Sequence, residues 1–289
     1  MTRTARGRLA RGLVIVVAWP AIAGAQGVAP TGPLQEAARL DVDGRTKEAR
    51  AIIQQVIDSA TAPLARAVAE RSMAISYAFD ADCTDAAKHE EAAIGYWATR
   101  EAAEPQNAFY QEGELANEAA RICIDAGDLD IAERWYRRGA QVGLREPEPR
   151  THPKSLWDYR LAHALARLAA RRGDAAAAAT HVAEARAALD DDPKMAAQQD
   201  RFYPYLTGYV ALYTGELERA ESELTRALAM QGNADDPFMN VLLGMTYEKL
   251  GDAERARDIY EKAYNLATAH NPPSAFARPF TRHKLGIGG

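Results

Sequence analysis

Few residues in this chain could do chemistry, and they are scattered. None of the six histidines stands in an H-E-x-x-H motif or at another spacing that gathers three metal ligands. Neither the nucleophile motif G-x-S-x-G nor a glycine-rich phosphate-binding loop occurs. Acidic pairs on neighbouring helices could act as in helical glycosidases, but exposed acids are the usual case and no pair stands out. We therefore expect no catalytic residue, no metal and no cofactor. The histidines are His89, His152, His163, His181, His270 and His283.

Composition and spacing favour an all-α chain. Of its 289 residues, 47% are hydrophobic, which is enough to bury a large core. Prolines stand between the apolar segments and not inside them. Apart from the apolar N-terminus, no run alternates β-branched with polar residues. Helices must therefore position any functional side chain.

The best-defined helices lie between Pro237 and Thr268, on either side of a turn at Gly251-Asp252. A glycine there can end the first helix in the left-handed conformation, and the aspartate can cap the second. Residues three or four apart share one helical face. Each helix carries small and large residues on such a face, namely Leu243, Gly244 and Tyr247 in the first and Ala256, Tyr260 and Ala263 in the second.

This pattern, L-G-x2-Y…A-x3-Y…A, resembles the tetratricopeptide repeat. The family's usual tryptophan is replaced by Asn240, and its closing proline comes late, at Pro272. Degenerate copies start near residues 30, 67, 113, 159, 201 and 237, and the copy at 67 lacks the turn glycine. The resemblance implies a right-handed α-solenoid of about six antiparallel helix pairs over residues 34–273. Gly208 and Gly244 would then lie where two helices cross closely.

The two ends of the chain have other characters. Residues 1–25 combine a basic start, an apolar run from Leu13 to Ile22, and a small-x-small site ending at Ala25, as in a cleaved Sec-type signal peptide. The alternatives are a fortuitous apolar start or an uncleaved anchor, although the run is about half the length of a membrane span. Residues 26–33 are an expected linker, and residues 274–289 an expected C-terminal cap with a disordered tail. We expect a periplasmic or secreted protein.

The charge of the chain bears on its partners. Removal of residues 1–25 takes four arginines away and changes the formal net charge from −5 to −9. A chain this acidic is a poor candidate for nucleic-acid binding. We therefore expect a protein or peptide partner, no nucleic acid and no membrane span after cleavage, and leave the oligomeric state open.

The solenoid resemblance brings the only two cysteines to a similar height. Cys83 would begin the second helix of one pair, and Cys123 would lie near the end of the next first helix. These helices run antiparallel, so the start of one is level with the end of the other. In an oxidising compartment a disulfide is expected. Two buried free thiols are the alternative.

The same resemblance implies a ligand surface. In tetratricopeptide solenoids the first helices line a concave groove, and here a basic first helix would stand beside an aromatic one. Arginine forks suit carboxylates, and tyrosine or phenylalanine supplies rigid contact area. We expect Arg160, Arg167 and Arg171 to form an exposed strip that His163 joins when protonated below about pH 6.5. The groove candidates are Asn117, Arg121, Arg160, His163, Arg167, Arg171, Phe202, Tyr205, Tyr209, Tyr213, Met245 and Lys249.

Three functions remain open at this point. The favoured one is a non-catalytic protein–protein interaction module that holds a peptide or protein segment, with carboxylate and apolar side chains, in the concave groove. The second is a structural or assembly scaffold of the cell envelope that contacts partners through the convex face. The third and least favoured is a helical envelope enzyme. For the groove itself, the alternative is that the arginines form a solvated face while the tyrosines pack against neighbouring helices.

Overall fold

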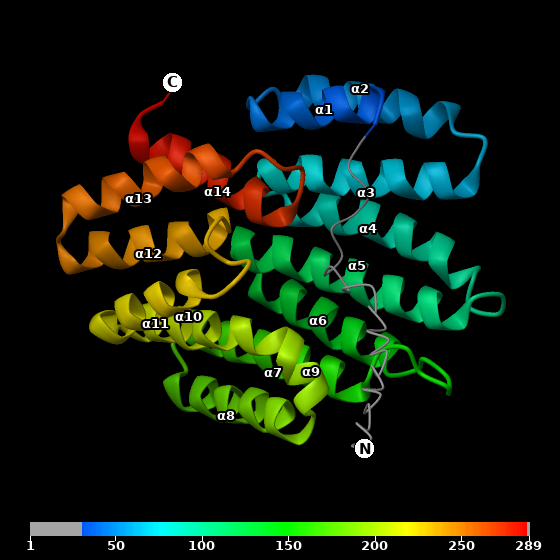
Figure 1. Cartoon of the computed structure of the whole chain (residues 1–289). Helices are drawn as coiled ribbons and strands as arrows, with labels where there is room; N and C mark the ends of the chain where they lie inside the picture. The colour runs from blue at the N-terminus through cyan, green and yellow to red at the C-terminus, as the bar shows by residue number, and fades with distance from the viewer. Residues whose placement is uncertain (1–30, 288–289) are drawn as a thin grey trace, which may run out of the picture.

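A computed structural model describes residues 31–287, and these residues form helices and connecting turns with no strand among them (Figure 1). The prediction of an all-α fold is confirmed. Proline or an aspartate or asparagine cap begins many of the helices, as expected where the first N–H groups lack partners. The helices are α1 (Pro33–Val42), α2 (Thr46–Ser59), α3 (Pro63–Phe79), α4 (Cys83–Ala98), α5 (Pro105–Ala126), α6 (Leu129–Gly143), α7 (Lys154–Arg171), α8 (Ala175–Asp191), α9 (Pro193–Gln199), η1 (Asp200–Phe202), α10 (Tyr203–Thr214), α11 (Leu217–Ala229), α12 (Pro237–Leu250), α13 (Ala253–Leu266) and α14 (Pro272–Leu285).

Consecutive helices pack as pairs, and the pairs stack in chain order (Figure 1). The first helices of the pairs are α1, α3, α5, α7, α10 and α12. Two features explain the long spacing of the middle repeats. Helix α5 begins at Pro105, well before the expected start near residue 113, and the short α9–η1 segment is inserted between α8 and α10. The arrangement is the predicted α-solenoid of helix pairs.

The turns inside the pairs follow the predicted glycine rule. Gly127, Gly215 and Gly251 end their helices with φ of 96°, 88° and 82°. In this left-handed conformation the N–H of the glycine or of the residue after it bonds the last helical carbonyls. After the last of these turns, Asp252 caps α13 by accepting a bond of 3.0 Å from the Arg255 N–H. The equivalent turn between α3 and α4 has Ala81 at φ 55°, the one non-glycine residue with positive φ among residues 31–287.

We expect Ala81→Gly to stabilise the fold by about 1 kcal/mol, because a side chain in the left-handed region costs about that much. Gly127→Ala at the equivalent turn should lower the free energy of unfolding by a similar amount. Its Cβ would meet no atom within 4 Å, so only the backbone conformation is tested. Urea titrations of both variants and the wild type measure the two changes. Equal stabilities for all three would show that these turns relax without strain.

Close helix crossings occur where small residues were predicted. A Cβ on Gly208 would lie 2.7 Å from Leu224 Cγ, and one on Gly244 would lie 2.5 Å from Tyr260 Cε1. Both values are shorter than van der Waals contact, so α10 and α12 approach their partners α11 and α13 through glycine. The expected packing at these two positions is confirmed.

The C-terminal helix α14 does more than cover the last pair. It packs against α13 and α12, and also against α3, α5 and α1 from the first half of the chain. Figure 1 shows α14, in red, beside the start of the solenoid. The helix begins at Pro272, and Gly286 ends it with φ 67°. Of the tail predicted to be disordered, Gly288 and Gly289 lie outside the described residues.

A buried polar contact joins the two ends of the solenoid. Asp41 of α1 is 1% exposed. It accepts a bond of 2.8 Å from Ser76 Oγ of α3 on one oxygen and lies 2.8 Å from His270 Nε2 on the other. Serine, aspartate and histidine meet here, yet a nucleophilic serine would have to donate to the histidine. In this order the carboxylate instead links α1, α3 and the segment before α14.

Two arginines of α14 strengthen the same junction. Arg278 Nε and Arg282 Nη2 donate to the carbonyl of Val42, the last residue of α1, at 3.1 Å each. Cationic groups at a helix C-terminus satisfy free carbonyls and favour the helix dipole. Gly44 leaves space for Arg282, since a Cβ there would collide with the guanidinium. The first and last parts of the stack are therefore joined to each other.

Candidate binding surface

The predicted basic and aromatic helices lie side by side, and their side chains touch each other directly. Arg167 of α7 donates to Tyr205 Oη of α10 at 3.2 Å and to Tyr136 Oη of α6 at 3.0 Å. One turn later, Arg171 donates to Tyr209 Oη at 3.4 Å and lies 5.0 Å from the ring centre of Tyr213. The alternative in which the tyrosines pack against the neighbouring helix describes this geometry.

Burial follows from these contacts and corrects the expected exposed strip. Arg167 is 6% exposed and His163 is 8% exposed, and Tyr205 and Tyr209 are buried as well. Burial, then the charge of Arg167, lowers the pKa of His163 well below its usual value. His163 therefore stays neutral at the pH where we expected it to join a positive strip. Whether any of these residues binds a ligand remains a prediction.

A carboxylate that the sequence reasoning missed lies in the same interior. Asp125 of α5 follows Arg121 by one helical turn, and its closest oxygen is 3.9 Å from Arg121 Nε. The Arg121 guanidinium stacks at 4.5 Å on the Phe238 ring of α12, so the two first helices meet across the interior. Burial raises the pKa of Asp125 to about 6, although Arg121, Arg167 and Arg171 act in the opposite direction. The i, i+4 spacing between Arg121 and Asp125 could have indicated this pair from the sequence.

Part of the predicted surface is accessible. Arg171, Tyr213 and Met245 are half-buried, and Lys249 is exposed. They come from the last turns of α7, α10 and α12, which are consecutive first helices. We call these four residues the rim. It combines two cations with one aromatic and one thioether side chain.

The remaining candidates lie elsewhere. Asn117 faces the second helix of its own pair, since a Cβ on Gly139 would lie 2.7 Å from its Oδ1. Arg160 pairs with Glu114 and covers the ring of Trp157 at 5.1 Å. Phe202 lies in η1 under the guanidinium of Arg201. Phe202 also packs against the cluster that contains Tyr205 and Tyr209. The contacts of Asn117 and Arg160 given above involve neither Arg167 and Arg171 nor Tyr205 and Tyr209.

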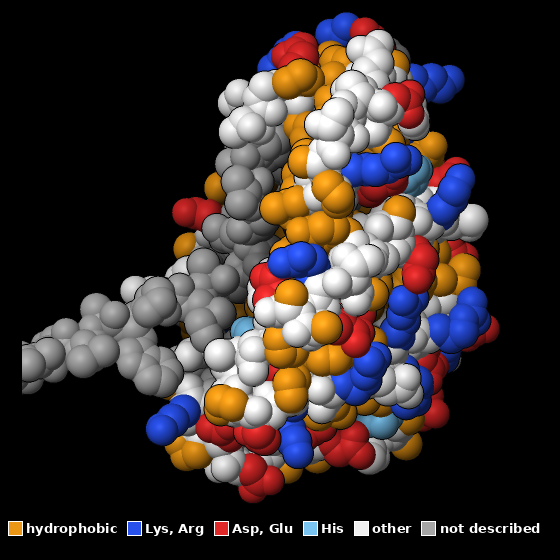
Figure 2. Space-filling model, turned by 90° about the vertical axis from the view of Figure 1, so that its right-hand side faces the viewer, with side chains coloured by type: hydrophobic (Ala, Val, Ile, Leu, Met, Phe, Trp, Pro, Cys, Tyr) orange, Lys and Arg blue, Asp and Glu red, His pale blue; other side chains and the backbone are white. Residues whose placement is uncertain are grey.

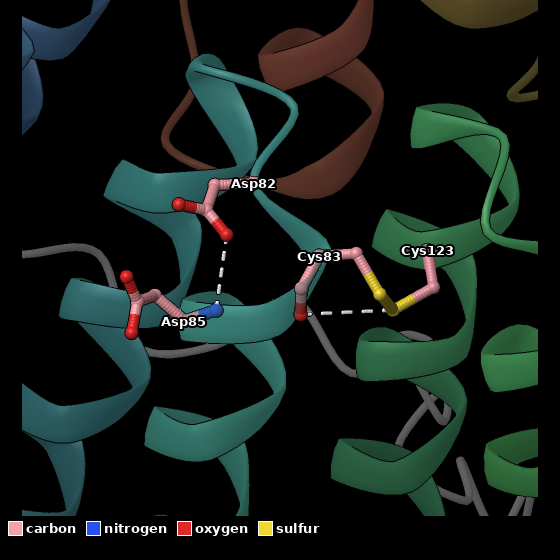
Figure 3. Close-up of a disulfide and its surroundings, with 4 residues drawn as sticks. All are labelled: Asp82, Cys83, Asp85 and Cys123. Atoms are coloured by element: carbon pink, nitrogen blue, oxygen red, sulfur yellow. Dashed lines mark hydrogen bonds between the residues drawn. A yellow bond between two sulfur atoms is a disulfide. The ribbon is translucent and has the colours of Figure 1, made fainter.

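The two cysteines form a disulfide between the start of α4 and the end of α5 (Figure 3). Their Cα atoms are 4.7 Å apart. Asp82 caps α4 immediately before Cys83, by accepting a bond of 3.1 Å from the Asp85 N–H. The predicted bond between Cys83 and Cys123 is confirmed.

Buried carboxyl groups lie on α4 and α5. Glu90 of α4 is fully buried, and this burial, then the nearby Glu118 carboxylate, raises its pKa well above the usual value. Arg71 of α3 pairs with Glu118 through two bonds of 2.8 Å. Farther along α5, burial and then the charge of Glu101 raise the pKa of Glu112 to about 7. The environments of Glu90 and Glu112 therefore favour the neutral forms of these two acids.

We expect Glu112→Gln to be more stable than the wild type at pH 8. The pKa of Glu112 in the folded protein, about 7, exceeds the ordinary value. The contribution of Glu112 to the free energy of unfolding is therefore fully present below about pH 4.5 and is lost as the pH rises through 7. The gap between variant and wild type should widen by about 1–3 kcal/mol from pH 5 to pH 8. Urea titrations at the two pH values measure it. Glu254→Gln, at an exposed site on α13, is the control and should show no such widening.

Residues 31–287 include no cluster of three or more His, Cys, Asp or Glu side chains that could hold a metal ion. None of the helices in this range has the length and apolar character needed to cross a membrane.

The fold defines an all-α solenoid of stacked helix pairs whose C-terminal helix returns to its start. Comparison with known families identifies it further: residues 239–270, nearly the whole α12–α13 pair, match the family model described as tetratricopeptide repeat. The α12–α13 pair is thus a tetratricopeptide repeat. That repeat indicates a role in protein–protein interaction or scaffolding, and the family is generally non-catalytic. No curated protein matches the chain.

Proposed function

We propose that the protein is a non-catalytic interaction module of the periplasm or the secreted space, which binds a peptide or protein segment at the rim. The observation that carries this proposal is that Arg171, Tyr213, Met245 and Lys249 are accessible toward the C-terminal ends of three consecutive first helices. Cations and apolar surface together suit a segment with carboxylate and apolar side chains. An affinity around micromolar, about −8 kcal/mol, is typical of such a groove.

The buried contacts between the arginines of α7 and the tyrosines of α10 hold in place the helices that carry the rim. Because Arg167 and Tyr209 are buried and bonded within the protein, they hold α7 and α10 together and do not meet the partner. Binding energy must then come from the accessible Tyr213 and Met245, since each exposed ion pair contributes only about 0.2–1 kcal/mol. This moves the proposed contact toward the helix ends.

The proposed location rests on two features of the chain. Residues 1–25 have the character of a cleaved signal peptide, and they lie outside the described residues. The disulfide between Cys83 and Cys123 suits an oxidising compartment. On the face shown in Figure 2, basic and acidic side chains are interspersed, which suits a protein partner better than nucleic acid.

Affinity capture from envelope extract tests the rim. Tyr213→Ala should lower the affinity for the captured partner by about tenfold, because it removes the aromatic contact. Lys249→Glu should lower it by about fivefold and reverse its salt dependence. The matched control is Lys262→Glu, an equally exposed lysine on the second helix α13. If Lys262→Glu weakens binding as much as Lys249→Glu, the contact does not lie at the rim.

One observation favours the second function, a scaffold that binds through its outer face. A cleft of about 480 Å³ runs between α8 and the outer side of α10 and α11. One wall is a row of alanines on α8, and Tyr203, Thr207 and Val210 of α10 form part of the other. Ala179→Glu fills this cleft without touching the rim. Loss of partner capture in Ala179→Glu, with capture retained in Tyr213→Ala, would select the scaffold.

A further inference from the structure

A second, smaller cavity lies where α14 returns to the first half of the chain. It has a volume of about 300 Å³, near the lower limit for small-ligand pockets. Its walls come from the end of α3 and the following turn, the end of α5, and α14. Figure 1 shows these segments, which are far apart in sequence, beside one another. The lining is Ala78, Phe79, Asp80, Ala81, Ile122, Asp125, Ala126, Pro272, Ala275, Phe276, Pro279 and Phe280.

Apolar side chains dominate the cavity, and aromatic rings form two sides of it. Phe79 and Ile122 are buried at its base, while Phe276 and Phe280 of α14 are half-buried and stack on each other at 5.3 Å between ring centres. Asp80 and Ala81 at the mouth are exposed. A ligand that enters past this mouth would bury an apolar body against three phenylalanine rings.

The cavity has two polar side chains, both carboxylates. Asp80 is held by Arg50 in an ion pair of 2.7 Å. The side chain of Asp125 is only 10% exposed, and its nearest cationic nitrogen, Arg121 Nε, is 3.9 Å away, beyond hydrogen-bond distance. A carboxylate that is taken out of water without hydrogen bonds is costly, so a donor in the cavity would stabilise it.

The arginines near Asp125 contact other groups, and Arg121 Nε and Arg167 Nε have no hydrogen-bond partner among the described residues. Arg167 donates to two tyrosine hydroxyls, Arg171 donates to a third, and Arg121 stacks on Phe238. None of these three guanidinium groups lines the cavity. Asp125, in contrast, lines the cavity.

We propose that this cavity binds a small primary amine with an apolar, preferably aromatic, body, whose ammonium group donates to the Asp125 carboxylate. The ammonium supplies the hydrogen bonds that Asp125 lacks, and charge-assisted bonds of this type are the strong ones. The faces of Phe276 and Phe280 also attract a cation through their ring quadrupoles. The cavity shares no lining residue with the rim, although Arg171 of the rim is one of the cations near Asp125.

Three probes with the same phenylpropyl body and different heads test the proposal by calorimetry on the disulfide-bonded protein. At pH 8, 3-phenylpropylamine should bind about tenfold tighter than 3-phenylpropanol. The anion 3-phenylpropionate should bind weakest, because it faces two carboxylates. Equal binding of amine and alcohol would overturn the proposed ammonium contact. Tighter binding of the carboxylate would mean that the arginines behind Asp125 define an anion site instead.

The pH dependence of amine binding provides a second readout. Asp125 titrates with a pKa of about 6, so the affinity for the amine should fall as the pH is lowered from 8 to 5, while that for the alcohol stays constant. Invariant amine affinity over this range would contradict the contact. The charged and titratable groups around Asp125 are Asp80, Arg121, Tyr136, Arg167, Arg171, Tyr209 and Tyr213.

Variants separate the carboxylate from the cavity. Asp125→Asn should make the amine bind no better than the alcohol, with alcohol binding retained as the check that the fold is intact. Ala126→Leu should fill the cavity from its wall on α5 and abolish binding of all three probes. Asp128→Asn, at an exposed residue one turn away that forms no side-chain hydrogen bond, should leave every affinity unchanged. Full amine preference in Asp125→Asn would refute the assignment.

Discussion

Replacing Trp157 with alanine is expected to lower the free energy of unfolding by about 3–5 kcal/mol. The side chain is fully buried in α7, between α5 and α6. It occupies space left by two glycines, because a Cβ on either Gly113 or Gly143 would collide with the indole ring. Removing the indole leaves a large cavity at the junction of two repeats, and the surrounding helices are held too firmly elsewhere to close it.

Urea titration of Trp157→Ala measures this loss. Trp157→Phe is the matched control and should lose much less, since it keeps most of the volume and removes an indole N–H that has no hydrogen-bond partner. A loss below about 1 kcal/mol in Trp157→Ala would contradict the packing described here.

The glycine that faces the indole allows a coupling test. Gly143→Ala should destabilise the wild type by about 1–3 kcal/mol through overpacking. In the Trp157→Ala background the same change should cost much less, because the clashing ring is gone. Additive losses in the double variant would place the alanine methyl away from residue 157.

Local signals account for the parts of the fold that the sequence predicted well. A turn glycine followed by an aspartate marks the end of α12 and the start of α13, and Gly244 marks the crossing of these two helices. These signals act between residues a few positions apart, so they survive in a single sequence. The similar height of Cys83 and Cys123 followed from the antiparallel packing of successive helices that the tetratricopeptide resemblance implies.

Contacts between distant parts of the chain were not predictable. Asp41 and His270 are 229 positions apart, and neither belongs to a periodic pattern that would indicate the other. This contact depends on where the chain returns in space. Arg150 is a different case: its guanidinium donates to the nearby carbonyls of Gly143, Leu144, Glu146 and His152, and so orders a proline-rich connector that no periodic pattern describes.

The binding surface illustrates the difference between adjacency and exposure. Spacing placed Arg167 and Arg171 beside Tyr205 and Tyr209, and the structure has them so. Spacing did not reveal that tyrosine hydroxyls would accept the arginine bonds, which lets Arg167 be buried with no carboxylate in direct contact. The part of the predicted groove that is accessible is therefore the rim.

Reduction of the disulfide should lower the free energy of unfolding by up to about 4 kcal/mol. The bond closes a loop of 40 residues, and loss of this constraint raises the entropy of the unfolded chain. It also joins α4 to α5, and Cys123 lies in a cluster with Ala120, Ile124 and Tyr136 where thiols would still pack. We therefore expect the reduced protein to fold, with lower stability.

Two measurements decide this prediction. Thiol titration of the unfolded, unreduced protein should find no free thiol, and two free thiols would rule the bond out. Urea titrations with and without dithiothreitol should differ by the stated amount for the wild type and not at all for Cys83→Ala/Cys123→Ala. If the wild type is equally stable in both, the bond does not constrain the unfolded chain. If the protein is exported, as we propose, the purified protein should match the oxidised sample, because an oxidising compartment forms the bond during folding.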